Sequence, residues 1–151
     1  MSEQLSEHFT LEELTRTGTG LPNTPDAAAL DNLRLLATGL LEPIRKLWGD
    51  RPIKINSGFR SQAVNVKIGG AKHSQHLKGE AADIVPFIPA EEAMKILYDA
   101  YKAGKLPTFG QIIIYSSGFL HVSIKGTRPG NEFLRSEARS GSGGPYRVYH
   151  P

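Results

Sequence analysis

The residues whose types and spacing best suit chemistry are two histidines and one aspartate. His76 and Asp83 lie in one short segment, and His121 lies in a later apolar segment. Alternate side chains of a strand point to opposite faces, so Asp83 and His121 each turn away from the apolar residues beside them. If the two strands are neighbours, these side chains can meet, and His76 can reach them from the preceding loop. Two imidazoles and one carboxylate, with a fourth position open, are a ligand set of catalytic zinc.

A metal at this place must use histidine and carboxylate ligands, because the chain has no cysteine. The same absence excludes a disulfide framework and thiol catalysis. Isolated histidines are more often surface or hydrogen-bonded core residues than ligands, so the spacing alone leaves both interpretations open. A longer pattern, S-x-H-x-x-G-x-A-x-D, favours a site. It consists of Ser74, His76, Gly79, Ala81 and Asp83.

Three motifs occur in the order that one peptidase family has them. They are the S-G-F-R-S segment at 57–61, the pattern at 74–83, and the L-H-V-S segment at 120–123. Together they resemble the zinc D-Ala-D-Ala carboxypeptidases and L,D-endopeptidases, which are VanY-like peptidases of the hedgehog/DD-peptidase fold. The resemblance extends from about His8 to about Lys125, which is most of the chain.

The resemblance implies that His76, Asp83 and His121 bind Zn²⁺. It implies that Arg60 is a catalytic residue that contacts a carboxylate or carbonyl oxygen of the substrate, and that Ser74 helps to hold the peptide. A guanidinium can bind a carboxylate through two parallel hydrogen bonds, which suits this role, although a surface arginine in a turn is the alternative. The implied reaction is hydrolysis of a peptidoglycan stem peptide, next to a D-amino acid or between L-alanine and a D-residue.

The general base is the point at which the sequence departs from the family. Relatives commonly carry an acidic residue three positions before the last zinc ligand, where this chain has Gly118, and residues 109–125 contain no aspartate or glutamate. His73, Glu80 and Tyr115 are possible replacements, but each also fits an ordinary structural role. General base catalysis typically contributes ~10²–10⁴-fold to the rate. The alternative function is therefore a weakly active or inactive family member that serves as a phage structural or wall-binding module.

The elements that must position these residues indicate an α+β fold. We expect a small, largely antiparallel sheet with helices packed on one face, which leaves the other face free for the site. Apolar spacing predicts a short helix after a capping box at Thr10, a bent helix over 25–48 broken near Pro43, and helices over 61–68 and 90–103. Alternation and turn residues predict strands over 52–56, 81–85, 111–115 and 119–124.

Charge and composition divide the chain in two. The 151 residues suit one domain, and the formal net charge of +3 equals the excess of basic residues in the last 27 positions, 125–151. We therefore expect a zinc peptidase-like domain over 1–125 and a basic Gly/Ser/Arg-rich tail over 126–151, with a flexible hinge at 141–145. The tail is either a solvated extension or an arm that docks on another protein, such as a virion protein, or on anionic wall polymer.

The sequence lacks features of a membrane protein, a nucleic-acid-binding protein and a secreted protein. No apolar run approaches the ~20 residues that span a bilayer, and no nucleic-acid-reading motif accompanies the mild positive charge. The polar, acidic N-terminus does not resemble a signal peptide. Small domains of the resembled family are common in phages, so we expect a protein that stays in the cytoplasm until lysis or one that is carried by a virion to the periplasm and cell wall.

Overall fold

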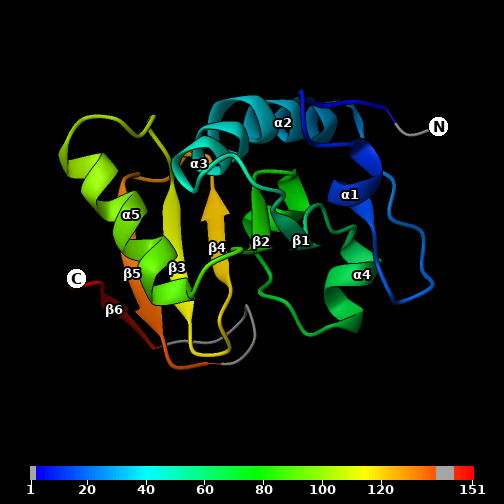
Figure 1. The fold of residues 1–151 in the computed structure, drawn as a ribbon. Helices are drawn as coiled ribbons and strands as arrows, with labels where there is room; N and C mark the ends of the chain where they lie inside the picture. Colours follow the sequence, from blue (N-terminus) through cyan, green and yellow to red (C-terminus); the bar gives the residue numbers. More distant parts are fainter. Residues whose placement is uncertain (1–2, 139–144) are drawn as a thin grey trace.

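The computed structural model describes residues 3–138 and 145–151, which form a sheet with helices around it (Figure 1). The helical elements are α1 (Leu11–Thr15), α2 (Ala27–Leu36), the π-helical η1 (Ala37–Leu41), α3 (Glu42–Leu47), α4 (Gln62–Lys67), the 3₁₀-helical η2 (Gln75–Lys78) and α5 (Ala90–Lys102). The strands are β1 (Lys54–Ser57), β2 (Ala81–Val85), β3 (Gln111–Tyr115), β4 (Leu120–Ser123), β5 (Glu132–Ser136) and β6 (Tyr146–Val148).

Within the described residues the strands form one 6-stranded sheet in the order β1-β2-β4-β3-β5-β6. The α+β class is confirmed, but the expectation of a largely antiparallel sheet is wrong, because β3 and β5 run parallel and the sheet is mixed. The cause lies in the connection after β4. It returns to the start of β3, where the N–H groups of Asn131 and Glu132 donate to the carbonyls of Phe109 and Gly110. The strand β5 therefore begins at the same end of the sheet as β3.

The two faces of the sheet differ in polarity as the strand alternation predicts. On β2 and β4, the side chains of Ala82, Ile84 and Val122 belong to the hydrophobic core, together with residues of α2, α3 and α5. Asp83 and His121 occupy the opposite face. The helices of the core thus cover one face, and the polar side chains are displayed on the other.

The helices near the N-terminus form through local signals. The capping box at Thr10 is confirmed, because its hydroxyl accepts from the N–H of Glu13 and the Glu13 carboxylate accepts from the N–H of Thr10. The break expected near Pro43 takes the form of η1, in which the N–H of Glu42 donates to the carbonyl of Ala37. Pro43 is the second residue of α3, so its missing N–H falls where the hydrogen-bonding pattern changes from π-helical to α-helical.

The segment after β4 contributes more regular structure than its composition indicates. The strands β5 and β6 both lie within 126–151 and pair with each other antiparallel. The hinge expected at 141–145 lies, apart from Pro145, outside the described residues. Among the described residues, no helix has both the length and the apolar character needed to cross a bilayer.

Candidate metal centre

Three donor side chains meet on the open face of the sheet. Asp83 on β2 and His121 on β4 are direct partners in the antiparallel register, and His76 comes from η2 just before β2. Oδ1 of Asp83 lies 3.0 Å from Nδ1 of His121 and 3.3 Å from Nε2 of His76. The donor atoms of the three residues all lie within 4.8 Å of one another. They are therefore close enough to share one ion.

A backbone carbonyl sets the tautomer of His76. Its Nδ1 lies 2.7 Å from the carbonyl oxygen of Gly58. A carbonyl only accepts, so Nδ1 carries the proton and donates, and Nε2 keeps its lone pair toward Asp83. Position 58 requires glycine here, because a Cβ would lie 2.4 Å from the carbonyl oxygen of Leu14. The close approach of α1 to this turn thus helps to orient a metal ligand.

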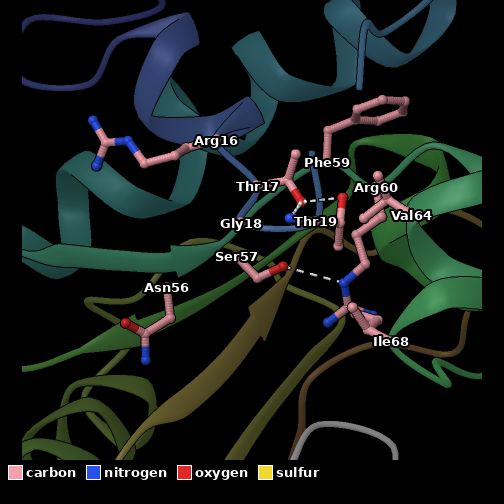
Figure 2. A pocket seen from close by; sticks show the side chains of 10 residues that line it. All are labelled: Arg16, Thr17, Gly18, Thr19, Asn56, Ser57, Phe59, Arg60, Val64 and Ile68. Atoms are coloured by element: carbon pink, nitrogen blue, oxygen red, sulfur yellow. Dashed lines mark hydrogen bonds between the residues drawn. The ribbon is translucent and has the colours of Figure 1, made fainter. Parts of the chain in front are cut away.

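Arg60 is buried beside Asp83 and binds the carboxylate oxygen that the histidines do not contact. Its Nη2 donates to Oδ2 of Asp83 at 3.3 Å, and its Nε and Nη1 donate to Ser57 at 3.1 Å and to Asn65 at 3.3 Å. Figure 2 shows the bond to Ser57 at the edge of a neighbouring pocket. The arginine therefore orients Asp83, and its contact with substrate stays a prediction.

The charges at the centre suit metal binding. Burial by itself would raise the pKa of Asp83, but its interactions with His76 and His121 lower this pKa well below its usual range. Burial lowers the pKa of His121, and the opposing effect of Asp83 is smaller. The carboxylate is thus ionised and the His121 imidazole is neutral at pH 7, which are the protonation states that metal coordination requires.

The donor set fits zinc. Nitrogen and carboxylate oxygen donors from three protein residues, with one position left for water or substrate, are the pattern of catalytic zinc sites. The carbonyl partner of His76 and the guanidinium partner of Asp83 supply the outer contacts that such ligands normally have. We therefore assign Zn²⁺ as the ion that this arrangement suits best.

A small pocket of about 80 Å³ adjoins the centre on the side of His121. Ser74, the N-cap of η2, lies in its wall, and its Oγ accepts the N–H of His76 at 3.2 Å. None of the described residues that line this pocket is acidic. They are Ala71, Ser74, Gln75, Gln111, Ile113, Tyr115, His121, Arg128 and Tyr146.

The structure supplies no acidic general base at the expected place. Gly118 has a φ of +97° in the hairpin turn and carries no side chain. Glu80 is buried, its carboxylate accepts from Gln75, and it does not line the pocket. His73 is exposed and also lies outside the pocket. Tyr115 does line the pocket, but burial and its contact with Tyr146 raise its pKa well above the usual range, so it is a proton donor at pH 7.

The roles of several residues around the centre were not predicted from the sequence. Ser57 and Asn65 hold Arg60, and the carbonyl of Gly58 holds His76. Arg128 and Tyr146 enter the pocket from the segment after β4. Alternation of apolar residues could not reveal them, because each acts through a turn or through a strand pairing that no local pattern specifies.

A second group of possible ligands lies near the N-terminus. Glu7, His8 and Glu42 also offer donor atoms within 4.8 Å of one another. The Glu42 carboxylate accepts from the Ser6 hydroxyl at 2.6 Å and from the His8 N–H at 2.7 Å, and it lies 2.7 Å from Nδ1 of His8. These bonds attach the N-terminal segment to α3, so we interpret the group as a structural contact.

Comparison with known proteins supports the resemblance found in the motifs. The zinc D-Ala-D-Ala carboxypeptidase of Streptomyces albus G is 38% identical to this chain over 78 residues, which are 51% of this chain and 31% of that protein. The chain thus spans about a third of the length of this curated relative. The sequence profile of the family described as Peptidase M15 matches residues 7–123, a range that includes all three proposed ligands. The chain belongs to the peptidase M15 family.

Proposed function

We propose that the protein is a zinc-dependent peptidase that hydrolyses peptidoglycan stem peptides. The bond cut is a D-Ala-D-Ala bond or a bond between L-alanine and a D-residue. The observation that carries the proposal is the convergence of His76, Asp83 and His121 on the face of the sheet opposite the hydrophobic core. Membership of the family and the carboxypeptidase activity named for the curated relative support the reaction and the substrate class.

Each residue of the centre has a distinct role in this proposal. His76, Asp83 and His121 hold the ion, and Arg60 orients Asp83 through its bond to Oδ2. A zinc ion at this place supplies Lewis acidity, which lowers the pKa of water to about 7 and polarises a carbonyl group. Tyr115 lines the pocket as a protonated phenol, so it can donate a hydrogen bond to an oxygen that gains negative charge during hydrolysis.

The test is hydrolysis under zinc-replete conditions. The protein is incubated with purified peptidoglycan and, separately, with a diacetyl-Lys-D-Ala-D-Ala peptide, and new amines and released D-alanine are measured. We expect product from the wild type and none from His121→Ala. Zinc-loaded wild-type protein that yields no product from either substrate would contradict the proposal.

A second candidate function is a family member that binds peptidoglycan or serves as a structural module without turnover. The absence of acidic residues from 109–125 and from the lining of the pocket favours it. The two functions separate in the same incubation, because a binding module would sediment with peptidoglycan and release no D-alanine or new amines.

The setting that we propose is a phage one. The protein would be a lysis enzyme that waits in the cytoplasm, or a virion protein that acts on the wall from outside. The support is the resemblance to small phage peptidases. Antibody detection of the protein in purified particles would distinguish the virion setting from the lysis setting.

A further inference from the structure

The segment that follows the family match places an arginine at the centre. The match ends at residue 123, whereas Arg128 and Tyr146 line the pocket beside His121. The register places Tyr146 opposite Ser136 on β5, and Ser136 opposite Tyr115 on β3. The open face that carries the ligands therefore continues across these strands to Tyr146.

Arg128 is held by the backbone of a short loop. Its N–H donates to the carbonyl of Lys125 at 3.0 Å, and the loop ends where Asn131 donates to Phe109 at 2.8 Å. Gly126 has a φ of +56°, and a Cβ there would lie 2.5 Å from Oε2 of Glu80. The loop thus packs closely against residues next to β2 and β3, so the position of Arg128 relative to the pocket is built into the fold.

Arg128 is half-buried, and its guanidinium has no partner in the described part of the chain. No hydrogen bond or ion pair joins its side chain to a described residue, in contrast to Arg60, which has three such bonds. An arginine is always charged, and partial burial without an anion is unfavourable. Among the residues that the structure describes, none that lines this pocket carries a carboxylate. A ligand that supplies a carboxylate would complete this arrangement.

The size of the pocket limits what it can hold. At about 80 Å³ it is much smaller than the roughly 300–1,000 Å³ of pockets for drug-sized ligands. It suits one small residue and not a continuing peptide chain. Ser74 and Tyr146, which both carry a hydroxyl group, line its wall. The wall therefore offers hydroxyl groups that can donate to the carboxylate of a terminal residue.

We infer that Arg128 receives the C-terminal carboxylate of a peptide that ends in a small residue such as D-alanine, which makes the protein a carboxypeptidase and not an endopeptidase. This inference rests on the proposed function. A side-chain carboxylate of the stem peptide offers the same chemistry, and the experiment distinguishes it, because only the terminal carboxylate is lost when the C-terminus is amidated.

The experiment compares diacetyl-Lys-D-Ala-D-Ala with its C-terminal amide. We expect the wild type to prefer the free acid, and Arg128→Gln to raise KM for the acid roughly ten- to hundredfold, since a hydrogen-bonded charge pair is lost. The variant should treat acid and amide alike. Arg147→Gln is the matched control, because Arg147 is exposed on β6, pairs with Glu137 and should leave KM unchanged.

Binding gives a readout that does not depend on turnover. N-acetyl-D-alanine and N-acetyl-D-alaninamide are titrated into zinc-loaded protein and followed by NMR. We expect only the acid to bind the wild type, and Arg128→Gln to weaken that binding about tenfold or more. Equal binding of acid and amide by the wild type, or an Arg128→Gln variant that binds the acid as the wild type does, would overturn the inference. Absence of hydrolysis with acid-selective binding would instead count against the proposed peptidase activity alone.

Discussion

Two groups of histidine and carboxylate side chains have ligand atoms within 4.8 Å of one another. One group is buried and the other is largely exposed. The group of His76, Asp83 and His121 is buried, with side chains that are 3%, 6% and 10% exposed. In the group at the N-terminus, Glu7 is 81% exposed and His8 is 33% exposed. The distances alone admit a metal at either place. Burial and the partners of each donor decide between them.

The partners show why only the buried group suits an ion. Gly58 binds Nδ1 of His76, and Arg60 binds Oδ2 of Asp83. These contacts leave Nε2 of His76 and Oδ1 of Asp83 directed toward each other and available to an ion. At the exposed group, both oxygens of Glu42 already bind the N-terminal segment. An ion there would have to displace those bonds in competition with water. Outer contacts that orient donors, more than short distances, thus characterise a metal centre.

The largest expected effect separates the two groups directly. His121→Ala should lower zinc affinity by about 100-fold or more, since loss of an outer partner alone typically costs 10–100-fold. His8→Ala should leave zinc affinity unchanged. Competition with a chromogenic chelator measures both. An equal loss of affinity in the two variants would show that the exposed group also binds zinc.

Removal of the outer partner of Asp83 should have the next largest effect. Arg60→Gln takes a charge and three hydrogen bonds from the centre, so zinc affinity should fall roughly 10–100-fold. Arg45→Gln is the matched control, because Arg45 pairs with the exposed Asp50 far from the ligands in sequence. The same chelator competition applies, and an Arg60→Gln variant with wild-type affinity would contradict the orienting role.

At the exposed group the expected effect is on stability. Glu42→Gln weakens the bonds to Ser6 and His8, so the free energy of unfolding should fall. The expected decrease is only about 1–2 kcal/mol, because water partly replaces these bonds at a site that is partly exposed. Urea denaturation measures this change, and zinc affinity should stay constant. Glu7→Gln, at a fully solvated position of the same group, should change stability by less than ~0.5 kcal/mol.

The smallest effect is the pH dependence of that stability. Burial would raise the pKa of Glu42, but hydrogen bonds from Ser6 and His8 outweigh it and lower the pKa below 4.5. A lowered pKa means that the carboxylate stabilises the fold above the unfolded pKa and that this contribution is lost as pH falls through the folded pKa. The stability difference between wild type and Glu42→Gln should therefore shrink as the pH falls below about 4.5. A difference that grows as the pH falls below about 4.5 would contradict this assignment.

Local patterns predicted the parts of the fold that depend on neighbours in sequence. The capping box at Thr10 forms within one turn, and the alternation around Asp83 and His121 needs only the period of a strand. Their place on the face opposite the hydrophobic core follows from the same alternation. These features depend on contacts between residues a few positions apart, so one sequence is enough to find them.

Other parts of the fold could not be predicted in this way. The segment 126–151 that contains β5 and β6 is rich in glycine, serine and arginine, and its two strands form by pairing with β3 and with each other. Edge pairing depends on the position of a distant strand, which no local pattern records. The same holds for Arg60, whose partners Ser57, Asn65 and Asp83 come from three different elements.

The sequence by itself determined the peptidase family, the α+β class and the identity of the residues proposed as ligands, because each depends on residue types at short spacing. Only the tertiary structure decided that the sheet is mixed, that Arg60 binds Asp83, and that Arg128 reaches the pocket beside His121. The physical reason is that these contacts join segments that are far apart in the sequence. Strand pairing and the packing of the whole domain bring these segments together. No local pattern of residue types records which distant strands will form hydrogen bonds with each other.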